Sequence, residues 1–243
     1  MREMDKLLLD AFQKMDIKSV CSLVRAGANV DLEDEHGNSL LHKAIYLGNR
    51  NLFESLILLG ADLNKKDPKG VTPLNQTIIL NRLKMMRRLL DEEKVDLNVV
   101  DKHGFSVMHY AAFSNLKAGD IQLLALSGVD VNKKNVWGET PLFVASSMQT
   151  VQALLDIGAD AKIKNRWGET PAKHFSCMAV KKYNDHLKKI NYYQIVDLLR
   201  QNECGDLAHK NVQTDMRQIN QIKRVGFLKY KNFIWKNDRR SRG

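Results

Sequence analysis

The sequence predicts an all-α fold, a solenoid of stacked helix–turn–helix units joined by β-turn or hairpin loops. One observation is a glycine that recurs at a period near 33 residues, which is typical of solenoid proteins. The recurring glycines are Gly37, Gly70, Gly104, Gly138 and Gly168. The second observation is that each glycine follows a short polar stretch and precedes a helix-start pattern: SLLH, TPLN, SVMH, TPLF or TPAK. A turn therefore opens each unit, and a helix follows it.

Each element of the unit has a physical reason. Glycine tolerates the backbone twist of a tight turn, Ser or Thr caps a helix, and Pro fits the first helical position because it has no N–H to leave unpaired. Apolar residues follow at helical spacing, as in Leu41, Ala44 and Ile45, and then a second helix such as NLFESLILLG. We expect four second helices to end at glycines: Gly27, Gly60, Gly128 and Gly158.

Several stretches in register resemble the ankyrin repeat: GADLNKKDPKGVTPL, GVDVNKKNVWGETPL, LLDIGADAKIKNRWGETP and HYAAF. The resemblance covers roughly residues 5–203. We therefore divide the chain into a repeat domain, 1–204, and a basic C-terminal tail, 205–243. The expected units are a capping helix pair at about 5–33 and repeats at about 34–66, 67–100, 101–134, 135–164 and 165–203.

Three units depart from the pattern. The third has DEEKVDLN where a Gly-Ala turn is expected, and the fifth is short by about three residues around SSMQTV. The sixth carries about a dozen extra residues within MAVKKYNDHLKKINYY, which predicts either a longer first helix or a bulging loop.

Composition and charge limit the cellular setting. The three cysteines, Cys21, Cys177 and Cys204, are too few and too scattered for a disulfide framework, which favours a reducing compartment. No window approaches the length of a transmembrane segment, and the N-terminal apolar run carries charges, unlike a signal peptide. We expect a monomer in the cytoplasm or the nucleus. Of the net charge of +10, the tail supplies +7, with ten Lys/Arg and three Asp.

The sequence contains no motif that predicts catalysis, so we expect no enzyme activity, no cofactor and no metal site. No phosphate-binding loop, His-Glu-x-x-His helix or nucleophile elbow is present. The family resemblance implies that His42 and His109 hydrogen-bond neighbouring turns, which is a structural role. Cys177 with His186, and Cys204 with His209, lack the paired close spacing of a zinc site.

The resemblance implies a partner-binding concave groove, lined by turn tips and first helices. Two tips carry tryptophans, Trp137 and Trp167, which would be exposed apolar surface unless a partner covers them. The alternative is that each tryptophan packs on its own or the neighbouring turn and stabilises the array. Candidate anchors on the first helices are Tyr46, Leu47, Ile79, Leu80 and Phe113.

Basic residues surround these anchors and complete the candidate site. They are Lys66, Lys69, Lys102 and Lys134, and His103, directly before the turn glycine Gly104, is a further candidate. A basic rim favours a protein partner with acidic and hydrophobic residues, because complementary charge speeds encounter and sets register. A solvated surface without a partner is the alternative.

The tail interleaves aromatic and basic residues: Lys229, Tyr230, Lys231, Phe233, Trp235, Arg239 and Arg240. Before them, Met216, Ile219, Ile222 and Val225 suit one side of a short helix. The tail could cap the exposed end of the solenoid, bind nucleic acid or anionic lipid, serve in nuclear import, or be mostly disordered.

The predicted function is a non-enzymatic protein–protein interaction module or adaptor that binds its partner on the concave groove. Repeat chains of this kind also occur as pathogen effectors or host-range factors, which would place this one in a host cytoplasm. The alternative function is binding of nucleic acid or an anionic membrane through the tail.

Overall fold

The computed structural model describes residues 2–114, 116–182 and 186–204, and in these ranges the chain forms helices and no β-strand. The prediction of an all-α fold is therefore confirmed. The described residues divide into two compact parts, one that ends at residue 169 and one that begins at residue 170, and each is described by itself. The tail predicted at 205–243 lies outside the described residues.

The helices follow the predicted order of turn, helix and helix. The first part contains α1 (Glu3–Gln13), α2 (Ile17–Arg25), α3 (Leu40–Leu47), α4 (Arg50–Leu58), α5 (Pro73–Ile79), α6 (Leu83–Leu90), α7 (Val107–Phe113), α8 (Ala118–Leu126), the 3₁₀ helix η1 (Pro141–Val144) and α9 (Met148–Asp156). The second part contains α10 (Pro171–Lys182) and α11 (His186–Cys204), which pack against each other.

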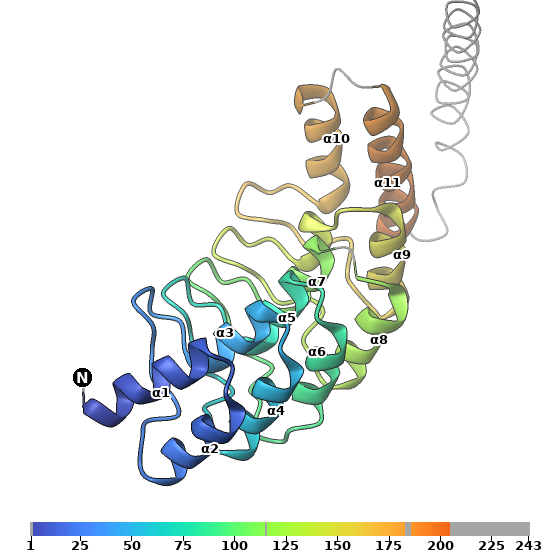
Figure 1. Cartoon of the computed structure of the whole chain (residues 1–243). Helices are drawn as coiled ribbons and strands as arrows, with labels where there is room; N and C mark the ends of the chain where they lie inside the picture. The colour runs from blue at the N-terminus through green and yellow to red at the C-terminus, as the bar shows by residue number, and fades with distance from the viewer. Residues whose placement is uncertain (1, 115, 183–185, 205–243) are drawn as a thin grey trace, which may run out of the picture. The chain divides into compact units, whose positions relative to one another are not determined.

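Within the first part, α3, α5 and α7 each pack on their own second helix, and α3 packs on α5, α5 on α7 and α7 on η1. Figure 1 shows α3, α5 and α7 following one another along the stack, with α4, α6 and α8 as their partners. The core lies between the two rows and is made of fully buried side chains such as Leu41, Ile45, Leu52, Phe53 and Leu56. Burial of this apolar surface stabilises the stack because no unit can cover its own flanks.

The predicted caps begin the first helices. The Ser39 hydroxyl accepts the backbone N–H of His42, and the Thr72 hydroxyl accepts that of Asn75. Pro73 occupies the first turn of α5. These side chains satisfy N–H groups that have no partner within the helix.

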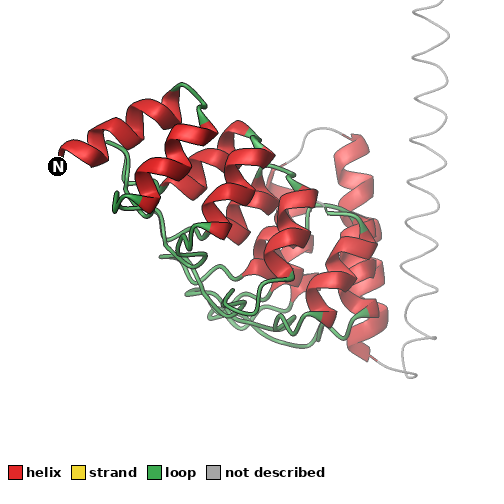
Figure 2. Cartoon of the chain, turned by 60° about the horizontal axis from the view of Figure 1, so that its bottom comes forward, coloured by secondary structure: helices red, strands yellow, loops and turns green. Residues whose placement is uncertain are grey.

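Backbone hydrogen bonds join the turns that open successive units. We call these turns the tips: residues 34–37, 67–70, 101–104, 135–138 and 165–168. The N–H groups of Lys102, Val136 and Arg166, second in their tips, donate to the carbonyls of the third residues one tip earlier: Lys69 at 3.4 Å, His103 at 3.0 Å and Trp137 at 2.9 Å. Pro68 holds the equivalent donor position in the second tip and has no N–H to give. Figure 2 shows the long loops, which carry the tips, gathered on one side of the helices.

The short unit and the long unit depart from the pattern in different ways. In the unit that begins at 135, the first helix is reduced to the 3₁₀ turn η1, and Ala145 is already extended. The chain is held there because the Ser146 N–H donates to the Ala112 carbonyl at 3.2 Å. In the last unit, α10 has 12 residues where α5 and α7 have 7, which agrees with the prediction of a longer first helix.

Candidate interaction face

Three exposed apolar side chains hold the same position on three successive first helices. Tyr46, Ile79 and Phe113 each lie seven residues after the cap of their helix, and their side chains are 67%, 44% and 68% exposed. Because α3 packs on α5 and α5 on α7, these residues form a row along the stack, which we call the inner stripe. The next position adds Leu47, which is exposed, and Leu80, which is half-buried. All five residues were predicted from the sequence, and their role in binding stays a prediction.

The two tip tryptophans differ in their surroundings. The Trp137 ring is half-buried and lies nearly parallel to the His103 imidazole, with ring centroids 5.7 Å apart. Trp167 is 58% exposed, and its ring contacts the Arg166 guanidinium at 5.2 Å. Trp137 therefore packs on the neighbouring tip, and Trp167 packs on a residue of its own tip.

An aromatic band connects the tips with the first helices. Phe105 has its ring 6.0 Å from Trp137 on one side and 6.0 Å from Tyr110 on the other. The Tyr110 hydroxyl donates to the Asp101 carboxylate at 2.7 Å, and burial together with this contact raises the pKa of Tyr110. We call His103, Phe105, Tyr110 and Trp137 the aromatic band.

Sequence reasoning missed Phe105 and Tyr110. The available signal was that the position after the tip glycine is aromatic in this unit alone: the other four carry Asn38, Val71, Glu139 and Glu169. It also missed Val136, which is 56% exposed beside Trp137.

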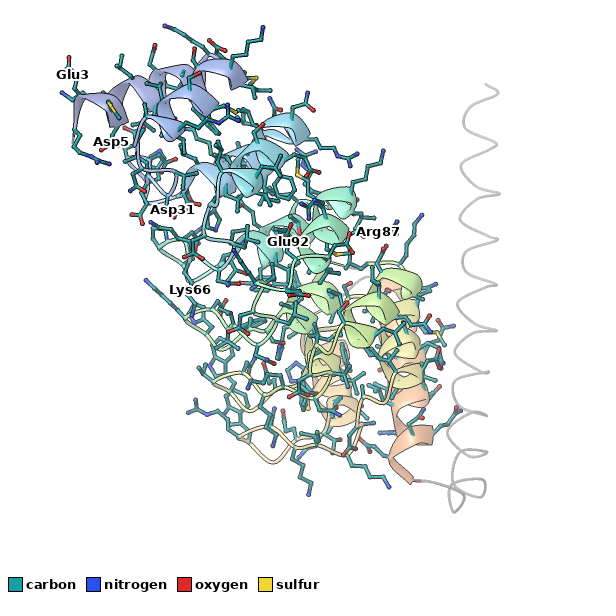
Figure 3. All side chains as sticks on the ribbon, turned by 90° about the horizontal axis from the view of Figure 1, so that it is seen from below. Glu3, Asp5, Asp31, Lys66, Arg87 and Glu92 are labelled. Atoms are coloured by element: carbon teal, nitrogen blue, oxygen red, sulfur yellow. The ribbon has the colours of Figure 1, made fainter. Side chains whose placement is uncertain are left out.

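Several lysines of the predicted rim take part in holding the units together. The Lys66 ammonium donates to the Val100 carbonyl at 2.9 Å, and the Lys134 ammonium reaches the Lys164 carbonyl at 3.4 Å. Figure 3 shows Lys66 among the loops. Lys69 and Lys102 are exposed and form no ion pair with a described residue. The rim therefore combines lysines that bridge units with lysines whose charge is unpaired within the described chain.

Two cations border the inner stripe on the side opposite the tip lysines. Arg82 and Lys117 lie in the turns between first and second helices, and both are exposed. The Arg82 guanidinium donates to the Tyr46 carbonyl at 3.2 Å, so it is held beside the stripe. Neither residue forms an ion pair with a described residue. We call Arg82 and Lys117 the turn cations; the sequence analysis did not identify them.

His42 and His109 have the structural role that the family resemblance implied. Their Nε2–H groups donate to carbonyls of the next unit, Val71 and Glu139, at 3.0 Å each. Desolvation by burial lowers the pKa of both rings, which keeps them neutral. Asn75 holds the equivalent position in α5; it is fully buried, and neither side-chain atom has a hydrogen-bond partner.

The second helices present a different surface. Leu58 on α4 and Leu126 on α8 are 82% and 79% exposed. A shallow depression on α2 and α4 is lined by Cys21, Val24, Arg25, Ser55, Leu58 and Leu59. On this side Arg87 of α6, labelled in Figure 3, pairs with Asp120 at 2.8 Å. These leucines are chemically similar to the inner stripe but lie on other helices, so they serve as matched controls.

Within the described ranges, no group of three or more His, Cys, Asp or Glu side chains could hold a metal ion. None of the described helices is long and apolar enough to cross a membrane. The predicted tail residues, from Lys229 to Arg240, lie outside the described residues.

Comparison with known families matches two stretches of the chain. The model described as ankyrin repeats (3 copies) matches residues 41–122, and the model of a single ankyrin repeat matches residues 137–166. The two stretches cover the inner stripe and the aromatic band, and the second ends one residue before Trp167.

Similar proteins occur in poxviruses and in humans. Ankyrin repeat protein OPG189 of Variola virus is 33% identical over 134 residues, which are 51% of this chain and 23% of that protein. Putative ankyrin repeat protein FPV034 of Fowlpox virus is 36% identical over 109 residues, 45% of this chain and 25% of that protein. Human SH3 and multiple ankyrin repeat domains protein 2 is 29% identical over 133 residues, 54% of this chain and 7% of that protein. The matched part thus spans a quarter or less of each relative.

Two solved structures share the fold. The ankyrin repeat protein EF0377 has a TM-score of 0.66 at 24% identity, covering 83% of this chain and 99% of its own. An ankyrin repeat domain from Acinetobacter baumannii has a TM-score of 0.65 at 26% identity, covering 79% of this chain and 95% of its own.

Proposed function

Because the chain is an ankyrin-repeat protein, a member of a family of protein–protein interaction modules, we propose that it binds a partner protein on the face formed by the first helices and the tips. The anchors are Tyr46, Ile79 and Phe113 of the inner stripe, with Leu47 and Leu80 beside them. The tips supply Trp167. The module works by binding alone and is not an enzyme.

The observation that carries this proposal is the register of the inner stripe. Tyr46, Ile79 and Phe113 are 44% to 68% exposed although each belongs to a helix whose other face is fully buried. Tyrosine and other aromatic side chains are enriched among the residues that dominate binding energy. A repeated apolar exposure at one helical position supports a shared contact, because random surface hydrophobics would not keep that register.

The partner has acidic residues as well as apolar ones. Lys69 and Lys102 lie at the tips, and Arg82 lies at the opposite border of the stripe, each without an ion pair to a described residue. Carboxylates on the partner would speed encounter and set its register on the face.

The poxvirus relatives support a finer proposal about setting. The proteins similar to this chain in Variola virus and Fowlpox virus are ankyrin repeat proteins. We propose that this chain is a pathogen effector or host-range factor that engages a host protein in the cytoplasm or nucleus. The chain would also act as an adaptor if a second region of it bound another protein.

Affinity capture with matched variants tests the binding face. The full chain and a Tyr46→Ala/Phe113→Ala variant are used as baits in host-cell extract, and captured proteins are quantified by mass spectrometry. Leu58→Ala/Leu126→Ala is the control, because it removes two exposed apolar side chains from the second helices. We expect the inner-stripe variant to lose a partner that the control retains. Equal capture by both variants would contradict the proposal.

A further inference from the structure

We propose that the bound segment is an acidic amphipathic α-helix of the partner, laid along the inner stripe with apolar residues seven positions apart over Tyr46, Ile79 and Phe113. This rests on the proposed function, since it assumes that the inner face binds protein, and it adds the conformation and chemistry of the ligand.

The spacing of the stripe fits a helix. Packed helices lie about 8–10 Å apart, so two steps from α3 to α7 place Tyr46 and Phe113 about 16–20 Å apart. Seven residues of α-helix rise about 10.5 Å and return to nearly the same face. A partner helix of about 15 residues, tilted slightly across the stripe, therefore presents one apolar anchor to each of the three units.

Extended ligands fit the stripe less well. Side chains on one face of a β-strand repeat at about 6.6 Å or 13 Å, which misses the unit spacing. A polyproline II segment repeats every three residues at about 9.3 Å and does match the spacing. Such segments dock between aromatic rings, however, and the central residue of the stripe is Ile79, an aliphatic side chain that offers no ring.

The cations beside the stripe favour acidic residues on both flanks of the partner helix. Arg82, held against the Tyr46 carbonyl, and Lys117 border the stripe at the interhelical turns, and neither meets a carboxylate of the described chain. Lys69 and Lys102 border it at the tips. A helix whose apolar stripe is flanked on both sides by Asp or Glu would pair with both rows.

The same charges argue against the chain's own tail as the occupant. The segment TDMRQINQIKRVG, residues 214–226, has apolar Met216, Ile219, Ile222 and Val225, but it carries three cations and one carboxylate. It would bring positive charge to the turn cations. A separate acidic partner is the favoured occupant.

A display selection tests the inference without a known partner. The chain of residues 1–243 is immobilised and selected against a random peptide library of about 18 residues, long enough for three anchors. Enriched peptides are synthesised and titrated by fluorescence anisotropy against the wild type, Ile79→Asp and the matched control Leu58→Asp. Tyr46→Ala/Phe113→Ala serves as a second inner-stripe variant in case Ile79→Asp fails to fold by circular dichroism.

We expect enriched peptides to carry apolar residues seven apart and an excess of Asp and Glu, and to gain helical circular dichroism on binding. Ile79→Asp should weaken them about tenfold, whereas Leu58→Asp should leave binding unchanged. Enrichment of proline-rich peptides with a repeat of three residues, whose binding is weakened by Ile79→Asp, would contradict the helical conformation. It would leave the proposed function standing. Peptides that bind both aspartate variants equally would overturn both.

One more outcome concerns the tail. If the wild type enriches nothing while an Ile219→Asp/Ile222→Asp variant enriches stripe-dependent peptides, the tail occupies the face and the separate partner is excluded. If neither the wild type nor this tail variant enriches any peptide, the inference is also overturned.

Discussion

The Trp137 indole lies 14° from parallel to the His103 imidazole, with ring centroids 5.7 Å apart. The backbone joins the same two tips, because the Val136 N–H donates to the His103 carbonyl at 3.0 Å. Trp137 is therefore part of the connection between two units, while Trp167, in the last tip, keeps most of its ring exposed. Two residues in the same sequence motif thus have different environments.

This difference predicts that removing each ring affects a different property, stability for Trp137 and partner binding for Trp167. Trp137→Ala should lower the free energy of unfolding by about 1–2 kcal/mol, because it loses the His103 stack and the edge contact with Phe105. Trp167→Ala should change it by about 0.5 kcal/mol or less and should weaken partner binding instead. Urea denaturation of both variants, paired with binding to the partner identified by capture, checks this. Equal destabilisation by the two substitutions would contradict the assignment.

The sequence predicted the scaffold well because each unit repeats the same local chemistry. Ser39 and Thr72 cap helices in the structure as their positions in the motif indicated. The inner-stripe residues could be named in advance because a repeat in register transfers one surface position to every unit. Their exposure, 67% at Tyr46 and 68% at Phe113, agrees with that expectation.

What the sequence did not reveal depends on neighbours distant in the chain. That Trp137 is half-buried follows from His103 and Phe105, which are more than thirty residues earlier. The reduction of a first helix to η1 follows from a shortened stretch whose chain is tied to Ala112. Arg82 was overlooked because its place beside the stripe comes from a bond to Tyr46 of the preceding unit.

Gly70 and Gly60 form a matched pair for testing how closely the tips approach. Both have positive φ, +86° and +84°, so an alanine at either position meets the same backbone strain of about 1–2 kcal/mol. A Cβ at Gly70 would also lie 2.8 Å from the Lys102 nitrogen, whereas one at Gly60 meets nothing within 4 Å. We expect Gly70→Ala to cost about 1 kcal/mol more than Gly60→Ala, because it also disturbs the bond from Lys102 to Lys69. Chemical denaturation measures both, and equal costs would refute the close approach.

Asn75 is a site where one substitution should stabilise the protein. Its buried amide has no hydrogen-bond partner, whereas His42 and His109 at the same position bond the residue after the next tip glycine. A histidine at 75 would face the Phe105 carbonyl in the same way. We expect Asn75→His to raise the free energy of unfolding by about 1 kcal/mol, as measured in urea. Asn75→Ala is the control, since it removes the unpaired amide without adding a donor, and a gain equal to that of Asn75→His would mean that the new bond contributes nothing.

The neutral state of His42 and His109 predicts how stability depends on pH. Desolvation by burial is the main cause that lowers the pKa of both rings below the usual value of 6.5, and the carbonyls of Val71 and Glu139 only partly oppose it. An unfolded chain therefore takes up protons first as the pH falls below about 6.5. The contribution of the two rings is complete above that pH and is lost as the pH falls toward their folded-state values, by up to about 1.4 kcal/mol per pH unit for each ring.

The lowered pKa values of Asp5, Asp16 and Asp34 act in a separate window, because their reference value is 3.8. Urea denaturation at pH 7.5 and 5.5 therefore isolates the histidines. We expect the wild type to be less stable at the lower pH and a His42→Asn variant to lose part of that difference, since Asn75 demonstrates that α5 accommodates an asparagine at this position. His36→Asn, at an exposed tip, is the control and should keep the wild-type difference. An unchanged pH dependence in His42→Asn would mean that protonation of His42 is not linked to unfolding.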